Sequence, residues 1–484
     1  MKKIVITYCL LFIACCLHAQ TTAEKNNDER NISIKYTPLK NTKIYLGSYF
    51  GKGKILSDSA WLNDKSEGVF KGKKLTSGIY FIVLANYVMQ FELLLGNTQQ
   101  FSIVADTANK DDVKITGSTD NDIFKEYTKY STAKGKEIDE LHKKLLQAKT
   151  QKDSTEIQQQ LANANAALNA SRESVIKKYP SSLLAVLLNT MKRPELPADA
   201  ATEEKKDSLF AFKYTKEHYW DDVNFYDDRN LHTPFFDLKI DEYFKYYVSP
   251  DADSIIPEIN YMLLSARTGK EMYPYLLLKF TNKYFSPEYM GQDKVFLFLF
   301  QNFYSKGDTV YLAQNSRKAV LDKAYSIMAN QLGSPAAVLN LTDTTGNKIL
   351  MQALQSKFTV VAFWDPTCSH CQKEIPKLDS FYRAKWKNEN VKIYSVNVND
   401  GETDKFKKFI EEKKLSNDWA EVYQPKAEKE ADIAAGRANF RQLYNIMQTP
   451  TFYLLDADKN IIAKQLTLEQ IDALLDVKIK SAKK

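Results

Sequence analysis

The sequence predicts three successive architectures: a small all-β domain, an α-helical region and a C-terminal α/β domain. Apolar and polar residues alternate through residues 31–118, as in half-buried strands. Apolar residues recur at helical spacing through residues 120–330. From residue 333 to 484, short apolar strands alternate with helical segments, which is typical of a mixed sheet covered by helices. The length of 484 residues is enough for about three domains.

Residues 1–19 have the pattern of a cleavable secretory signal peptide. Two lysines precede an apolar run, residues 4–17, that is too short to span a bilayer, and Ala19 is a small residue at the expected cleavage site. Lipidation at Cys15 or Cys16 is an alternative, but the residues before them lack the usual leucine, so we favour simple cleavage. We therefore expect an exported protein of the periplasm or cell envelope, with no transmembrane segment in the mature chain.

The first predicted domain, residues 31–118, consists of short strands between turn signals. Segments such as "NISIKYTP", "GIYFIVLAN" and "QFSIVAD" predict a small antiparallel sandwich or barrel. The domain contains no cysteine, no histidine and no acidic cluster with ligand spacing. We therefore expect a packing or partner-docking module.

The helical region opens with a stretch rich in Lys, Glu, Gln and Ala, residues 120–179. Apolar residues at helical spacing predict two long antiparallel helices joined near residues 149–152. Asp153 and Glu156 have the spacing of a capping box at the start of the second helix. A short helical hairpin is the expected structure.

Residues 181–330 are rich in aromatic residues at helical spacing, as in "FFDLKIDEYFKYYV" and "YPYLLLKFTNKYF". Such stripes are more often core than sugar-binding surface, and we interpret them as core helices. An acidic group is interpreted as a solvated turn because its spacing does not match an EF-hand; it comprises Asp221, Asp222, Asp227 and Asp228. The separate histidines receive no role; they are His142, His218 and His232.

Residues 333–484 predict one α/β unit. "AAVLNLTDTTGNKILM" indicates a hairpin, "FTVVAFW" a buried strand, and residues 368–388 a helix. "VKIYSVNV" is the next predicted strand, followed by the helix "DKFKKFIEEKK", a long connection, and a helix across residues 430–444. Two strands, "TFYLLDAD" and "NIIAKQ", and a closing helix complete a mixed sheet with helices on both faces.

Cysteine usage directs attention to one motif. Three of the five cysteines lie within the signal, so only Cys368 and Cys371 remain after cleavage. In an oxidising compartment this pattern indicates a pair kept for its chemistry. A purely structural disulfide is not favoured, because a bridge that closes so small a loop removes little entropy from the unfolded chain. A zinc site lacks enough further ligands nearby, so we predict neither a metal nor a cofactor.

The two cysteines stand where a predicted buried strand ends and a helix begins. A helix N-terminus stabilises an anion, which lowers the pKa of Cys368 and favours the thiolate that attacks disulfides. Cys371 lies three residues further along the same helix face, where it can resolve the mixed disulfide.

The segment "VVAFWDPTCSHCQKEIPKL" resembles the active-site segment of thioredoxin-fold proteins. "MQTPTFYLLD" is similar to the family's cis-proline element, so Thr449–Pro450 is the expected cis bond. The spacing CxxCxxEIP and the hairpin before it resemble the TlpA/ResA-like envelope thiol–disulfide reductases over about one third of the chain. Upstream, "YWDDVNFYDDRNLHTPFF" and the β-rich N-terminus resemble modules of unassigned function often fused to such domains.

The resemblance implies a role for each matched residue. Cys368 is the implied nucleophile, Cys371 the resolving thiol, Glu374 the active-site acid, and Pro450 the residue that helps to hold a substrate strand. The helix dipole alone would also favour an acid at Glu374.

Two positions depart from the family pattern. Ala362 stands where the fold often has a buried acid or amide, so Glu374 would carry more of the proton transfer. His370 precedes the second cysteine, as in strongly oxidising members, where it stabilises the thiolate; an exposed residue without a role is the alternative.

We predict a thiol–disulfide oxidoreductase. It acts as a reductase of envelope protein disulfides or of cytochrome c apoprotein thiols. Its partners are protein disulfide or dithiol substrates and a membrane-bound electron donor, and nucleic acid is not expected. A peroxiredoxin would need Thr and Pro where Asp365 and Val361 stand. Two alternatives remain open: an oxidase that donates disulfides, and an envelope binding protein with an accessory redox domain.

Overall fold

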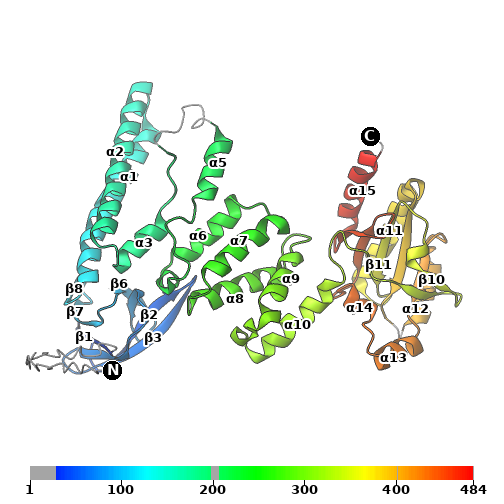
Figure 1. Cartoon of the computed structure of the whole chain (residues 1–484), viewed down its shortest axis with the longest axis horizontal. Coiled ribbons are helices and arrows are strands. Elements are labelled where there is room, and N and C mark those ends of the chain that lie inside the picture. The colour runs from blue at the N-terminus through cyan, green and yellow to red at the C-terminus, as the bar shows by residue number, and fades with distance from the viewer. Residues whose placement is uncertain (1–28, 198–206, 400–401, 483–484) are drawn as a thin grey trace, which may run out of the picture. The chain divides into compact units, whose positions relative to one another are not determined.

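The computed structural model describes residues 29–197, 207–399 and 402–482 (Figure 1). The predicted signal peptide, residues 1–19, lies outside these ranges. The chain divides into two compact units, one of residues up to 191 together with 229–236, and one of residues 192–228 and 237–484. Across the described ranges, no helix is long and apolar enough to cross a membrane.

The first unit begins with a β-sandwich. One sheet has the order β4-β1-β7-β8 and the other β3-β2-β5-β6. Both sheets contribute to one core, in which Ile34, Leu46 and Phe101 are buried. The strands are β1 (Glu29–Thr37), β2 (Thr42–Phe50), β3 (Gly53–Leu62), β4 (Glu67–Lys73), β5 (Gly78–Val83), β6 (Met89–Leu95), β7 (Gln100–Asp106) and β8 (Asn109–Thr116). The predicted all-β domain is therefore confirmed as a sandwich.

The prediction of a purely antiparallel arrangement was wrong, because β1 and β7 are parallel. The chain visits the second sheet between these two strands and returns in the same direction. Alternation of apolar residues reports which side chains are buried but carries no information about strand direction.

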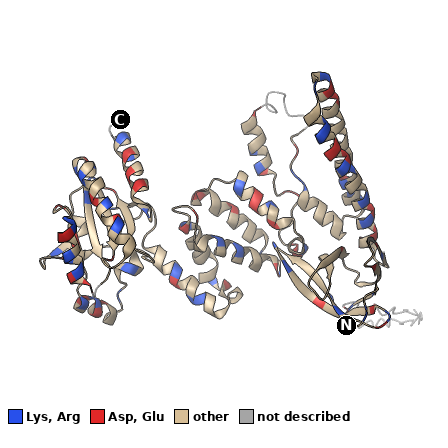
Figure 2. Ribbon diagram, turned by 180° about the vertical axis from the view of Figure 1, so that it is seen from behind, with Lys and Arg blue, Asp and Glu red and all other residues tan. Residues whose placement is uncertain are grey.

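The helical hairpin consists of α1 (Thr119–Gln147) and α2 (Gln151–Lys178). Leu141, Leu161 and Ala164 are buried along its seam, and positions of both basic and acidic residues occur along the two helices (Figure 2). The predicted capping box was wrong. The N-cap of α2 is Thr150, whose hydroxyl accepts the Asp153 N–H, so Asp153 lies inside the first turn. The following helix, α3 (Leu183–Met191), packs with the start of α1 against β5 and β6.

The second unit opens with the aromatic-rich helices, and their interpretation as core is confirmed. Tyr219, Trp220, Tyr243 and Phe280 are all buried. The helices are α5 (Ser208–Glu217), α6 (Phe236–Tyr246, whose first residue belongs to the first unit), α7 (Ala252–Ser265), α8 (Met272–Phe285), α9 (Asp293–Asn302) and α10 (Gln314–Met328).

The interpretation of the acidic group as a solvated turn was wrong for Asp228. Its carboxylate accepts the backbone N–H groups of Lys270, Glu271 and Met272, which stabilises the start of α8. The Asp221 carboxylate lies 2.7 Å from Nδ1 of the His218 imidazole.

The C-terminal sheet has seven strands in the order β10-β9-β13-β12-β11-β14-β15. β11, β12 and β13 run parallel, and the other neighbours are antiparallel, so the predicted mixed sheet is confirmed. The strands are β9 (Asn340–Asp343), β10 (Lys348–Leu350), β11 (Phe358–Trp364), β12 (Val391–Asn397), β13 (Ala420–Tyr423), β14 (Thr451–Leu455) and β15 (Ile461–Lys464). The helices are α11 (Ser369–Ala384), α12 (Thr403–Lys413), α13 (Lys426–Ala434), α14 (Phe440–Leu443) and α15 (Leu468–Ala482).

One strand of this sheet was missed, and one helix was drawn too long. β13 has only four residues, and its two buried positions are a glutamate and a valine, so no run of apolar residues marks it. The helix predicted across residues 430–444 is two helices, α13 and α14, separated by a turn with Gly436 at a φ of 65°. Positive φ favours glycine and ends a helix, which explains the break.

Candidate active site

The two cysteines lie at the junction of β11 and α11. Every residue of β11 is buried, and the strand ends at Trp364. The turn that follows is held by Asp365, whose carboxylate accepts both the N–H and the hydroxyl of Thr367 at 2.7 Å and the side-chain amide of Asn399 at 3.0 Å. Cys368 is the N-cap of α11. The turn therefore fixes where the helix starts and where the first sulfur lies.

Cys368 and Cys371 are both free thiols, but they differ in exposure. Cys368 is half-buried, whereas Cys371 is completely buried in the core beneath α11. A dissolved molecule can therefore reach the first sulfur directly but not the second.

The pKa of Cys368 lies below the ordinary cysteine value of 9.0. Partial burial raises the pKa, but hydrogen bonds outweigh this effect. They come from the backbone of Cys371 and His370 and from the side chains of Thr449 and Cys371. The more exposed sulfur is thus also the one that ionises more readily.

Burial raises the pKa of Cys371 to about 12. The backbone N–H of Asp365, which points at its Sγ over 3.5 Å, offsets only part of this effect. Of the two thiols, Cys368 is therefore the more readily ionised, and Cys371 stays protonated at neutral pH.

The Thr449–Pro450 peptide bond is cis, as the sequence predicted. The Thr449 carbonyl oxygen lies 3.6 Å from Cys368 Sγ, although 81 residues separate the two positions. Fold topology thus brings the proline segment directly against the first cysteine.

Glu374 and His370 are placed near the cysteines by sequence, but no hydrogen bond or ion pair among the described residues joins their side chains to either sulfur. The Glu374 carboxylate lies 3.8 Å from the Lys377 ammonium, which also pairs with Glu469. His370 is exposed at the start of α11. The structure therefore brings together Cys368, Cys371 and the proline segment. The side chains of Glu374 and His370 lie near this group in sequence but form no described polar contact with either sulfur.

Sequence reasoning missed Glu421, a buried carboxyl in the same domain. Register places Ala362, Ser395 and Glu421 in one row across β11, β12 and β13. Among the described residues, no hydrogen bond of ordinary geometry reaches either carboxyl oxygen of Glu421, and burial raises its pKa to about 8. The Ser395 hydroxyl lowers the pKa only partly, and it also accepts the indole N–H of Trp364 at 2.8 Å. Because β13 was not predicted, no sequence signal pointed to this residue.

Asp365 and Asn399 were also missed as supports of the active-site turn. Asn399 directly follows the predicted strand "VKIYSVNV", which is the one signal that would have placed it near the cysteines. Among the described residues, no group of three or more His, Cys, Asp or Glu side chains is arranged to hold a metal ion.

Two segments of the chain match known protein families. Residues 332–464 match the AhpC/TSA family. Residues 133–325 match a domain of unknown function, DUF5106. The first match spans the sheet and both cysteines, and the second spans most of the helical region.

Individual relatives match the C-terminal part of the chain. The thiol-disulfide oxidoreductase ResA of a Bacillus cereus strain is 26% identical over 148 residues, which are 30% of this chain and 77% of that protein. ResA of Bacillus subtilis (strain 168) is 35% identical over 68 residues, or 14% of this chain and 37% of that protein.

Solved structures with similarity to this chain include two from Bacteroides species. A thioredoxin-like protein from Bacteroides caccae ATCC 43185 is 19% identical with a TM-score of 0.43, covering 59% of this chain and 98% of that one. The thioredoxin domain of a thiol-disulfide oxidoreductase from Bacteroides vulgatus is 29% identical with a TM-score of 0.26, covering 31% and 97%.

Proposed function

We propose that this chain, whose residues 332–464 are a thioredoxin-like domain of the AhpC/TSA family, is an exported thiol–disulfide oxidoreductase that reduces disulfide bonds in envelope proteins. One observation carries the proposal: an accessible thiol with a lowered pKa stands one helical turn from a buried thiol with a raised pKa. This asymmetry is what a two-step disulfide exchange requires.

The reaction begins when the Cys368 thiolate attacks one sulfur of a client disulfide. A mixed disulfide forms, and the other client sulfur leaves as a thiolate. Cys371 then loses its proton and attacks Cys368 Sγ, which releases the second client sulfur. The client gains two electrons and two protons, and Cys368 and Cys371 become a disulfide. The carbonyl of Thr449 and Pro450 border Cys368, where they would hold the client backbone during both steps.

Cys371 must lose a proton in the second step although burial raises its pKa. We assign this proton to Glu374, one turn further along α11. Its carboxylate is about one-third exposed and, among the residues that the structure describes, forms a single long ion pair with Lys377 at 3.8 Å, so it can turn toward the sulfur. If the acid serves only the helix dipole, replacing it with glutamine will leave the rate of the second step unchanged.

The direction of electron flow depends on how strongly the protein stabilises the reduced form. The His370 backbone contributes to the lowered pKa of Cys368, and a protonated imidazole would stabilise the thiolate further. The reduction potential separates the two directions. A value near that of thioredoxin, about −270 mV, supports a reductase, whereas a value near that of DsbA, about −120 mV, supports an oxidase.

Regeneration of the dithiol requires an electron donor, which we place in the membrane. The predicted signal peptide supports export, and ResA relatives bear the name of thiol–disulfide oxidoreductases. Cytochrome c apoproteins are a second client class, because their paired cysteines must be reduced before haem attachment. An envelope binding protein with an accessory redox domain is the alternative; partner binding that survives replacement of both cysteines by serine would favour it.

Reduction of insulin disulfides by dithiothreitol, followed by turbidity, tests the proposed activity. The wild-type protein should accelerate the reaction, and Cys368→Ser should not. Equal rates with the wild type and with Cys368→Ser would end the proposal. Ser380→Ala, an exposed position on α11, serves as the matched control.

A further inference from the structure

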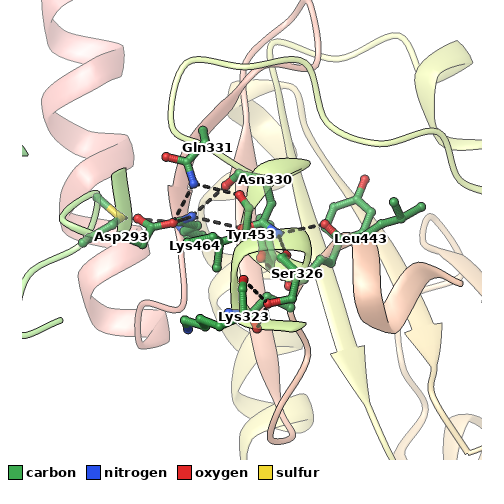
Figure 3. Close-up of polar contacts among 12 residues, drawn as sticks. Asp293, Lys323, Ser326, Asn330, Gln331, Leu443, Tyr453 and Lys464 are labelled. Atoms are coloured by element: carbon green, nitrogen blue, oxygen red, sulfur yellow. Dashed lines mark hydrogen bonds and ion pairs between the residues drawn. The ribbon is translucent and has the colours of Figure 1, made fainter. Parts of the chain in front are cut away.

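A buried polar cluster joins the helical region of the second unit to the thioredoxin-like sheet (Figure 3). The Lys464 ammonium at the end of β15 donates to Asp293 Oδ2 at 2.5 Å and to the backbone and side-chain oxygens of Asn330 at 2.7 and 3.1 Å. Gln331 donates to the same Asp293 oxygen at 2.9 Å. Lys464 and Asp293 are each only 6% exposed. A buried pair with every ammonium hydrogen satisfied fixes one geometry between the elements that it joins.

The cluster holds both flanks of the segment that carries the cis-proline. Before the proline, the side-chain amide of Asn330 donates to the Leu443 carbonyl at 2.8 Å, and Ser326 donates to the side chain of Asn445 at 3.2 Å. After the proline, Lys464 stands opposite Tyr453 of β14. The C-terminal part of α10 and the residues after it thus position the segment that contacts Cys368 Sγ.

The helical region also covers the outer strand of the sheet. Met290, in the connection between α8 and α9, accepts the backbone N–H of Lys464 through its sulfur at 3.3 Å. The chain entering the sheet pairs with β15 through Gly333 and Ser334, which bond the backbone of Ile461 at 2.8 and 2.9 Å. These contacts leave no room for an added strand along this part of β15. The neighbouring proline segment is exposed at Met447.

A groove of about 580 Å3 lies between these parts. One wall is the α8–α9 connection, with Tyr289 and Met290, and the other is the proline segment, with Met447, Gln448 and Thr451. Met447 is 84% exposed, Tyr289 53% and Met290 42%. Exposed apolar side chains that converge on one groove indicate an interaction site.

The groove lining carries no net charge, because its four charged residues are two of each sign: Glu288, Asp293, Lys323 and Lys464. Asp293 and Lys464 neutralise each other at its base, and exposed amides complete it; these belong to Gln448, Gln465 and Gln470. Amides bind backbone N–H and C=O groups of any sequence, and flexible methionine side chains adapt to different apolar partners. Such a lining suits an extended polypeptide rather than an ionic small molecule.

We propose that this groove binds the extended segment of a client protein next to its reactive cysteine, so that the helical region takes part in client selection. Gln448 and Thr451 line the groove, and between them lies Thr449, whose carbonyl is 3.6 Å from Cys368 Sγ. A chain joined to Cys368 by a mixed disulfide passes into the groove within a few residues of its cysteine. This inference rests on the function proposed above and assigns the recognition of its substrates.

Two groove variants and one control test the inference. Tyr289→Ala changes the helical wall, Met447→Ala changes the opposite wall, and Tyr226→Ala is the control because Tyr226 is 62% exposed and lies outside the groove. Each variant is assayed in the full chain with a peptide disulfide flanked by apolar residues and with hydroxyethyl disulfide, which is too small to fill the groove. Loss of an apolar contact should lower kcat/KM for the peptide about fivefold in each groove variant. Hydroxyethyl disulfide reduction should stay at the wild-type rate in all three.

The outcomes separate this inference from the proposed function. If Tyr289→Ala and Tyr226→Ala have equal kcat/KM for the peptide disulfide, the proposed groove is wrong, but the proposed reductase activity is not contradicted. A wild-type protein that reduces neither substrate overturns both. As an independent readout, a photo-cross-linking amino acid at position 289 should label a peptide trapped on Cys368 in the Cys371→Ser background. Absence of that cross-link contradicts the groove.

Discussion

Alkylation of the reduced protein should distinguish the two cysteines. We predict that iodoacetamide at pH 7 modifies Cys368 first and leaves the Cys371 thiol almost untouched. The cause is the difference between their pKa values, since only the thiolate reacts. Burial raises the pKa of Cys371 to about 12, while hydrogen bonds bring that of Cys368 below 9.0.

The size of the preference follows from these values. At pH 7 the thiolate fraction of Cys371 is about 10⁻⁵, and that of Cys368 is more than about 10⁻², a ratio of at least about 10³. The thiolate of higher pKa is intrinsically more nucleophilic. With a Brønsted coefficient of about 0.45, the Cys371 thiolate would react roughly 20-fold faster than the Cys368 thiolate. The net preference for Cys368 is therefore at least about 50-fold, and the burial of Cys371 increases it further.

Mass spectrometry can locate the first adduct. Trypsin leaves both cysteines in one peptide, residues 358–373, and fragmentation between them assigns the label because Ser369 and His370 separate the two positions. The unfolded protein in urea is the control, in which both cysteines should react at similar rates. A folded protein that alkylates Cys371 as fast as Cys368 would refute the assignment of nucleophile and resolving thiol.

Three further predictions concern the groups around the site and the buried cluster. Glu421→Gln removes a carboxyl whose pKa burial raises from 4.5 to about 8, so the folded state binds the extra proton between these values. Wild-type stability relative to the variant should be unaffected below pH 4.5 and fall by up to about 1.4 kcal/mol per pH unit up to pH 8, measured by hydrogen exchange of β12 and β13; a pH-independent difference would argue against it. Asp293→Ala leaves the Lys464 charge buried and should cost about 3–5 kcal/mol in urea unfolding. Lys318→Ala, which breaks the exposed pair with Asp322, should cost less than about 1 kcal/mol, and equal losses would contradict the role of the buried cluster. Thr449→Val keeps the backbone carbonyl but removes the side-chain hydroxyl, whose hydrogen bond lowers the pKa of Cys368, so the midpoint of Cys368 alkylation should move to higher pH. An unchanged midpoint would refute the contribution of the hydroxyl.

The cysteine pair and its proline partner were predictable because short sequence patterns carry their chemistry. A buried strand, two cysteines and a following helix are contiguous in the chain, and the Thr449–Pro450 element has its own recognisable flanks. Their contact across 81 residues required the fold, which the alternation of strands and helices also predicted. The lowered pKa of Cys368 followed from its helix position, although the structure adds the Thr449 hydrogen bond.

Features that depend on distant or weakly patterned residues were not predictable. β13 is too short to stand out, and a glutamate interrupts its apolar residues, so Glu421 was not recognised as a buried residue. The Lys464–Asp293 pair joins positions 171 residues apart, and neither residue has a sequence context that distinguishes it from a solvated charge. Local periodicity reports burial and helix formation, but pairings of this kind are set by how the helices pack on the sheet.

Trapping of a mixed disulfide tests the central claim most directly. Cys371→Ser keeps the nucleophile but cannot complete the second exchange, so a disulfide-bonded client incubated with this variant should remain covalently attached through Cys368. Peptide mapping should find the client joined to Cys368, and reductant should release it. If no adduct forms with Cys371→Ser, or if Cys368→Ser traps the client equally well through Cys371, then Cys368 is not the attacking thiol and the proposed reaction is wrong.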